Sequence, residues 1–170
     1  RRSQEDSVPY DQWQAEGLIT ATDGSAIDED AIEACIRALC GTYDVQRIGF
    51  DPYHTRRMMA RLADDGLPVV EVAQHYRLMS PAMKNTEKAI LERRLRHGGH
   101  EALRWAFANV VMPVPDPNGN VKPSKKHSRN LKIDPAVATM IAMALATVAD
   151  EDAIYDFEAL TGRTEKEAHG

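Results

Sequence analysis

The strongest constraint on the fold of this chain is an alternation of short apolar runs with a helical pattern near its middle. Residues 45–50 (VQRIGF) and 67–73 (LPVVEVA) are typical of buried strands, and residues 53–65 between them repeat apolar side chains at helical spacing. Two strands joined through a helix form a βαβ unit, in which the strands are parallel. The chain is therefore predicted to be an α/β protein with a parallel sheet at its core.

Helices are predicted before and after this unit in the sequence. They are expected over residues 9–16, 28–40, 80–96, 101–110 and 134–149. Ser80 and Pro81 are expected to open the third of these, because serine is a favoured N-cap and proline a favoured first helical residue. The Asn118-Gly119 pair predicts a hairpin whose second arm includes Val121.

Charge is distributed unevenly along the 170 residues, which carry a net charge of −5. Residues 84–132 contain 11 Lys and Arg against four Asp and Glu, whereas residues 1–50 and 133–170 are acidic. A basic middle between acidic ends is typical of a fold with one face for a polyanion. The plainer interpretation is a solvated helix surface, which explains most isolated basic stretches.

Several classes of protein are excluded by what the sequence lacks. No apolar run approaches the roughly 20 residues of a membrane span, so no membrane partner is expected. The chain has no GxxxxGK[ST] motif, so it is not expected to bind ATP. Cys35 and Cys40 lie five residues apart on a predicted helix and do not form a disulfide framework, which indicates a reducing compartment.

Asp51 and Asp134 occupy similar positions in the predicted fold. Each follows an apolar or extended stretch, precedes a proline and is expected to open a helix. Helix capping, worth about 1 kcal/mol, is therefore one explanation for both residues. A second explanation is a ligand site, because ligands of α/β sheets bind beyond the carboxyl ends of the strands. Asp51 lies at such an end, and Gln74 and Tyr76, after the second strand, are expected to border the same cleft.

A basic loop before Asp134 favours the ligand site. Its cations are Lys122, Lys125, Lys126, Arg129 and Lys132. Carboxylates bind Mg²⁺ or Mn²⁺, two such ions about 3.5–4 Å apart promote phosphodiester hydrolysis, and cations hold the phosphate backbone. The sequence thus predicts catalytic and metal-binding roles for Asp51 and Asp134, provided that the fold brings them together. Two ions call for a third acid, and no other Asp or Glu lies at an equally good junction.

Five segments in a fixed order carry a family resemblance. They read PYDQW, IGFDPY, VVEVAQHYRLMSPAMKNTEKAI, HGGHEALRWAFANV and NGNVKPSKKHSRNLKIDPAVATMIAMALA. Together they resemble the nuclease domain of tailed-bacteriophage terminase large subunits over roughly residues 8–150. The resemblance implies a ribonuclease H-like α/β fold, a mixed sheet flanked by helices, as a domain over residues 1–150. Residues 151–170 are then an acidic tail that is partly helical or disordered.

The same resemblance implies a metal-dependent endonuclease that cuts concatemeric viral DNA during packaging, with two Mg²⁺ or Mn²⁺ ions in the complete site. Two of the three acidic clusters of the family fall on Asp51 and Asp134. The first cluster belongs on an opening strand upstream, as does the packaging ATPase, and this chain is expected to lack both, which leaves its activity as a fragment open. The implied partners are double-stranded DNA, the portal and the terminase small subunit, and the implied location is the host cytoplasm.

Two other functions stay open on the residues alone. One is a non-catalytic DNA-binding or motor-assembly module, in which Asp51 and Asp134 are only helix caps. The other is a recombinase or junction-resolving enzyme, because the ribonuclease H-like fold serves many functions.

Overall fold

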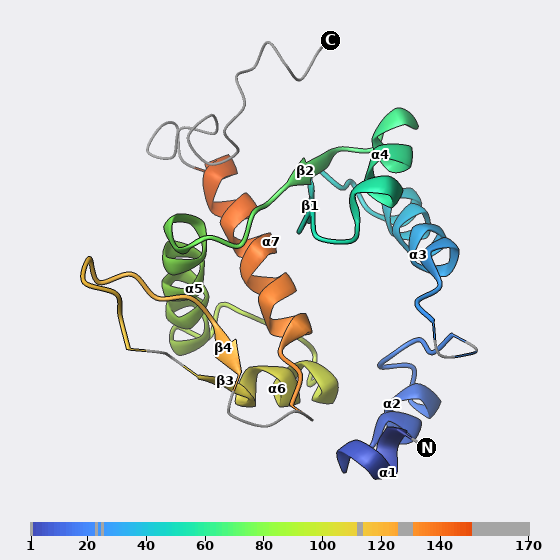
Figure 1. The fold of residues 1–170 in the computed structure, drawn as a ribbon, viewed down its shortest axis with the longest axis horizontal. Helices are drawn as coiled ribbons and strands as arrows, with labels where there is room; N and C mark the ends of the chain where they lie inside the picture. Colours follow the sequence, from blue (N-terminus) through green and yellow to red (C-terminus); the bar gives the residue numbers. More distant parts are fainter. Residues whose placement is uncertain (1, 23, 25, 112–113, 126–130, 151–170) are drawn as a thin grey trace.

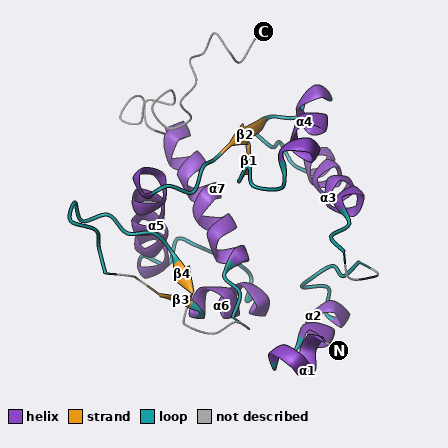
Figure 2. Cartoon of the chain, viewed as in Figure 1, coloured by secondary structure: helices purple, strands orange, loops and turns teal. Residues whose placement is uncertain are grey.

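The parts of the chain that the computed structural model describes are residues 2–22, 24, 26–111, 114–125 and 131–150. They form helices and short strands (Figures 1 and 2), which confirms the predicted α/β class. In chain order the elements are α1 (Arg2–Asp6), α2 (Tyr10–Ala15), α3 (Glu29–Thr42), β1 (Ile48–Phe50), α4 (Arg56–Asp64), β2 (Val69–Glu71), α5 (Tyr76–Leu91), α6 (Glu101–Ala108), β3 (Val110–Val111), β4 (Ser124–Lys125) and α7 (Asp134–Asp150). The predicted acidic tail, residues 151–170, lies outside the described residues.

The predicted βαβ unit is confirmed. Strands β1 and β2 are parallel, with Ile48 opposite Val69 and Phe50 opposite Glu71, and α4 connects them. Both strands are shorter than predicted and only half-buried. The first is short because the amide of Val45 donates to the carbonyl of Tyr43 in a local turn, so the chain enters the ladder only at Ile48.

The main core lies between α5, α7 and the β1–β2 sheet. Figure 1 shows α5 and α7 side by side, and the contacts between residues confirm that they pack against each other. Met79 of α5 is fully buried there, together with Met140, Ile141 and Ala144 from one face of α7. Burying one such large apolar side chain stabilises a fold by roughly 1.5–3 kcal/mol. The side of α7 that carries Ile141 also borders the cleft described below.

Two smaller clusters attach the N-terminal helices. Met58, Met59 and Leu62 of α4 are buried against Phe50 and Ile36. Helix α3, which supplies Ile36, has no buried residue of its own.

The second of these clusters joins α2 to α6. Trp13 is buried with Val8 and Ala102, and its ring meets those of Tyr10 and Trp105 edge to face. Such aromatic pairs add about 0.5–1.5 kcal/mol beyond the area that they bury.

The predicted start of the long helix at Ser80 is wrong. Helix α5 begins at Tyr76, and His75 caps it by accepting a hydrogen bond from the amide of Leu78. The extra turn buries Leu78 in the main core, which offsets part of the cost of Pro81 inside the helix. Ser80 is buried, and its hydroxyl accepts a hydrogen bond from the amide of Val121 (3.2 Å).

The predicted hairpin is confirmed, although its second arm begins later than expected. Strands β3 and β4 are antiparallel, with Val110 opposite Lys125. The turn is wider because Asp116 accepts hydrogen bonds from the backbone amides of Asn118 (2.9 Å) and Asn120 (2.7 Å). The pair next to the turn is Val111 and Ser124, and the second arm includes Lys125, a residue of the predicted basic loop.

This turn should depend on pH. The backbone amide of Asn120, then its side chain, and the amide of Asn118 lower the pKa of the Asp116 carboxyl below its ordinary value. Because the pKa is lower in the folded chain, the stabilisation is present above the unfolded pKa and is lost as the pH falls through the folded pKa. We expect the Asn118 and Asn120 amides to lose hydrogen-exchange protection over that acidic range, and Asp116→Ala to lose it at neutral pH. Equal protection in Asp116→Ala and the wild type would contradict this.

Candidate functional site

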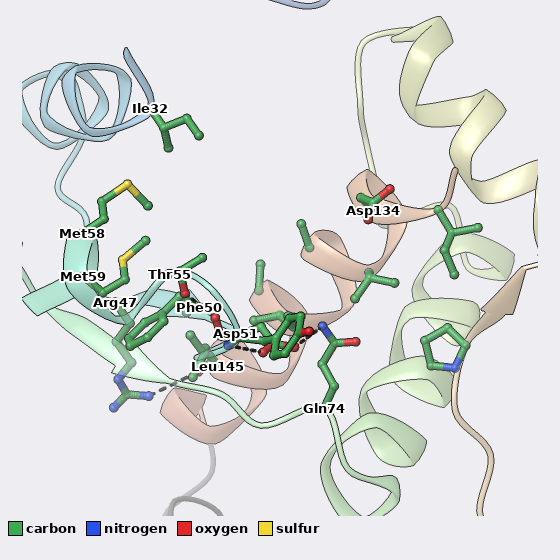
Figure 3. A pocket seen from close by; sticks show the side chains of 18 of the residues that line it. Ile32, Arg47, Phe50, Asp51, Thr55, Met58, Met59, Gln74, Asp134 and Leu145 are labelled. Carbon is green, nitrogen blue, oxygen red and sulfur yellow. Dashed lines mark hydrogen bonds between the residues drawn. The ribbon is translucent and has the colours of Figure 1, made fainter. Parts of the chain in front are cut away.

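A cleft of about 1300 Å³ opens between one face of α7 and the β1–α3–α4 side of the molecule. Its apolar walls include Ile32, Met58 and Leu145. Its polar lining includes both acids singled out by the sequence, Asp51 and Asp134 (Figure 3). Two residues that are 83 positions apart in the sequence thus line the same cleft.

Asp51 directly follows β1 and is half-buried, with both carboxylate oxygens engaged. Its Oδ1 accepts a hydrogen bond from the backbone amide of Tyr53 (2.8 Å), and its Oδ2 accepts one from the side-chain amide of Gln74 (2.6 Å). The expectation that Asp51 caps a helix is wrong. Helix α4 begins five residues later with Thr55 at its N-cap, and the Thr55 hydroxyl donates to the carbonyl of Asp51.

Asp134 is the first residue of α7, as predicted, and its side chain is exposed. Within the described part of the chain, no hydrogen bond or ion pair engages its carboxylate, so it caps no helix amide. The buried Asn109 fixes the chain just before it, since the Asn109 side-chain amide donates to the carbonyl of Lys132 (3.2 Å). Residues at helical spacing after Asp134, including Val137 and Ile141, line the same cleft. The first turn of α7 therefore presents Asp134 on the cleft face of the helix.

Close contact between β1 and α7 brings the two acids to one cleft. Gly49 has no side chain, and a Cβ placed there would lie 2.7 Å from both Ile141 Cγ2 and Leu145 Cδ1. Arg47 crosses the same contact, and its guanidinium donates to the carbonyl of Leu145 (3.2 Å). Because Asp51 follows Gly49 by two residues, this contact sets the position of Asp51 relative to α7.

The predicted cations are distributed over the cleft and its surroundings. Lys125 and Lys132 are exposed and line the cleft. Lys122 does not line it, and its Nζ lies 5.6 Å from the centre of the Tyr76 ring, a cation–π distance. The two remaining cations of the predicted loop, Lys126 and Arg129, lie outside the described residues.

Other cleft residues were predicted in part. Gln74 lines the cleft as expected, whereas Tyr76 does not. Sequence reasoning missed Tyr53 and Arg47, both of which line it. Tyr53 could have been found from its place two residues after Asp51, where an Asx turn is typical of an Asp-Pro sequence. No local pattern points to Arg47, because its partner Leu145 is 98 residues away.

The oxygen donors of the cleft fit a hard divalent cation as part of its ligand set. Asp51 and Asp134 supply carboxylate oxygens, the donors that Mg²⁺ and Mn²⁺ prefer. The described residues contain no group of three or more His, Cys, Asp or Glu side chains that could hold a metal ion. Further ligands must then come from water, from substrate or from residues beyond those described.

Among the residues placed by the structure, no helix combines the length and the apolar character that crossing a lipid bilayer requires.

Comparisons with known proteins identify a family and several similar proteins. The family model described as "Terminase large subunit, endonuclease domain" matches residues 1–151. The terminase large subunit of Enterobacteria phage HK97 is 33% identical over 147 residues, which is 85% of this chain and 29% of that protein. Protein YmfN of Escherichia coli K12 is 34% identical over 149 residues, or 86% of this chain and 32% of that protein.

A solved structure shares the fold. The crystal structure of the HK97 bacteriophage large terminase superposes with a TM-score of 0.76 at 32% sequence identity, covering 85% of this chain and 30% of that one. The chain thus spans about a third of the length of the relatives that it matches.

Proposed function

The chain belongs to the family of terminase large-subunit endonuclease domains, and from this we propose that its cleft is a metal-dependent site that hydrolyses phosphodiester bonds of double-stranded DNA. The observation that carries the proposal is that Asp51 and Asp134 line one cleft together with Lys125 and Lys132. In a full-length terminase the reaction would cut concatemeric viral DNA at the start and end of packaging.

The acids and the lysines of the cleft have different roles in this proposal. Asp51 and Asp134 bind Mg²⁺ or Mn²⁺ through their carboxylates. A pair of such ions, when bound, activates the attacking water and stabilises the leaving oxygen. Lys125 and Lys132 bind phosphates beside the scissile bond and hold the strand in the cleft. Phosphate contacts carry no sequence information directly, so this part of the site favours cutting with little sequence preference.

We propose that the sheet is of the ribonuclease H-like type and that a further strand pairs with β1. Strand β1 pairs with β2 through the amide of Ile48 and the carbonyl of Phe50. Alternation along a strand turns the backbone groups of Gly49 to the other edge, and no strand of the described residues pairs there. A strand from sequence upstream of this chain would complete the sheet and supply a third acid near Asp51.

The wider biology follows from the same proposal. A full-length protein with this domain would also carry the packaging ATPase and act with the portal and the terminase small subunit in the host cytoplasm. The domain would extend over residues 1–150. Of the competing functions, the binding module required Asp51 and Asp134 to be helix caps. Neither carboxylate accepts a hydrogen bond from a helix amide among the described residues, which argues against that function. Membership of the terminase family argues against a recombinase or resolvase.

The direct test is nicking of supercoiled plasmid by a full-length protein that contains this chain. We expect relaxed plasmid with Mn²⁺ or Mg²⁺ and none with EDTA. Unrelated plasmids should be cut at comparable rates. Absence of any nicking at millimolar Mn²⁺ would contradict the proposed activity.

Lys125→Ala should weaken DNA binding and lower its salt dependence. Each phosphate contact contributes roughly 0.7–0.9 to the slope of log affinity against log salt, so the variant should lose about that amount. Fluorescence anisotropy of a labelled duplex in EDTA measures the slope without cleavage. Lys88→Ala is the matched control, because Lys88 is exposed on α5, pairs with Glu92 (4.0 Å) and does not line the cleft. Equal slopes for Lys125→Ala and Lys88→Ala would remove Lys125 from the DNA contacts.

A further inference from the structure

We infer that Gln74 is a positioning residue, whose neutral side-chain amide orients the Asp51 carboxylate for binding a divalent cation. The inference rests on the proposed function, because it assigns a task within the same cleft. It starts from the 2.6 Å hydrogen bond that Gln74 Nε2 donates to Asp51 Oδ2. Figure 3 shows Gln74 turned toward Asp51.

The backbone on both sides of Gln74 is held in place. On one side, the amide of Val72 donates to the carbonyl of Phe50 (2.8 Å), which extends the β1–β2 ladder to the residue beside Asp51. On the other side, His75 caps α5, and its own amide donates to the carbonyl of Ala73 (2.8 Å). Gln74 is thus fixed between a strand end and a helix start, and its side chain needs little further ordering to reach Asp51.

Two hydrogen-bond donors hold the Asp51 carboxylate in one orientation. They occupy only part of its lone pairs. A carboxylate has about four lone-pair sites on its two oxygens. The amide of Tyr53 takes one site on Oδ1, and Gln74 takes one on Oδ2. The remaining sites are available to a cation, and the plane of the carboxylate is set before the cation arrives. Partners that orient a metal ligand in this way matter in proteins, since their loss costs roughly 10–100-fold in metal affinity or activity.

The chemistry of glutamine suits this task better than that of a charged donor. A Lys or Arg side chain at position 74 would also donate to Asp51, but its positive charge would repel an incoming divalent cation. The glutamine amide donates the same kind of hydrogen bond and leaves the full negative charge of Asp51 for the cation.

The test is Mn²⁺ binding by the DNA-free, nucleotide-free full-length protein, followed by electron paramagnetic resonance of free Mn²⁺. We expect Gln74→Leu to raise the Kd of the Asp51-dependent site about tenfold or more at a temperature where the variant is fully folded. In plasmid nicking, the Mn²⁺ concentration for half-maximal rate should rise by a similar factor, and the rate at saturating Mn²⁺ should change much less. A merely structural role would not produce this split.

Matched variants separate the outcomes. Gln46 is the same residue type, is exposed and lines the same cleft, but makes no described contact with Asp51, so Gln46→Leu should bind Mn²⁺ like the wild type. Gln74→Asn keeps an amide that is one methylene too short, and it should show the same weakening if Gln74→Leu does not fold.

Two results would overturn the inference in distinguishable ways. If Asp51→Asn removes the Mn²⁺ site while Gln74→Leu and Gln74→Asn bind Mn²⁺ with the wild-type Kd, the positioning role is wrong and the proposed function stands. If Asp51→Asn leaves Mn²⁺ binding and nicking unchanged, the proposed function fails and the role of Gln74 fails with it.

Discussion

Asp51→Asn and Asp134→Asn should each reduce DNA nicking by at least about 100-fold. Asparagine keeps the shape of aspartate but removes the negative charge that binds a divalent cation. Loss of a residue that only orients a metal ligand already costs roughly 10–100-fold, so loss of the ligand itself should cost more. The measurement is the rate of plasmid relaxation in Mn²⁺ by the full-length protein.

The fold should survive both substitutions. The Asp134 carboxylate has no described partner to lose, so Asp134→Asn should leave the melting temperature within about 1–2 °C, since exposed substitutions away from special features change stability by roughly 0.5 kcal/mol or less. At position 51 an asparagine oxygen can still accept from the amide of Tyr53, and the Gln74 amide can turn so that its oxygen accepts from the new side chain. Loss of activity without unfolding would therefore locate the effect in the chemistry.

A surface acid provides the control for these two variants. Asp64 ends α4, has no described ion pair and does not line the cleft, so Asp64→Asn should cut DNA at the wild-type rate. If either cleft variant cuts as fast as Asp64→Asn, the metal-binding assignment of that aspartate is wrong.

The sequence was sufficient to predict the parallel β1–β2 pair and the candidate acids, because both follow from local rules. Alternating strand and helix patterns imply parallel strands, and ligands collect beyond the carboxyl ends of such strands. Asp51 could be singled out because it directly follows an apolar strand. Asp134 could be singled out because it precedes a proline at the start of an apolar helix.

Details that depend on competition between neighbouring segments could not be predicted. Ser80 and Pro81 form a good helix start locally, but the burial of Leu78 favours a start one turn earlier. The side chain of Asp51 binds the amide of Tyr53 rather than the end of α4, because the helix starts later than its residue pattern suggested. The first case is a tertiary contact that overrides a local preference, and the second is a competition between two local structures, a turn and a helix start.

The packing of β1 against α7, which positions the site, could not be predicted from local sequence patterns either. Gly49 packs against Ile141 and Leu145, and Arg47 donates to Leu145, so the partners lie more than 90 residues apart. A glycine inside a strand indicates a close backbone approach in general. The sequence does not say which element approaches.

Gly49→Ala should destabilise the chain and reduce cutting together. The added Cβ would lie 2.7 Å from methyl groups of Ile141 and Leu145 and 3.3 Å from Val72 Cγ2. Ile141 is buried and β-branched, so its side chain has little freedom to move away. Overpacking of this kind costs about 1–3 kcal/mol, which lowers the melting temperature of a domain of this size by several degrees. Thermal unfolding of the chain measures the shift.

The slower DNA cutting expected of Gly49→Ala has a cause other than lower stability. Comparison with Gly41→Ala separates the two causes. If α7 moves away from β1 to admit the new methyl group, Asp134 moves with it and the distance to Asp51 changes. Gly41→Ala is the matched control, because Gly41 lies in α3 with no atom within 4 Å of an added Cβ, and alanine there should stabilise the helix by up to about 1 kcal/mol. We therefore expect the two glycine variants to shift the melting temperature in opposite directions, and only Gly49→Ala to slow nicking at a temperature where both are folded. If Gly49→Ala melts at or above the wild-type temperature, α7 does not pack on β1 as closely as the site requires.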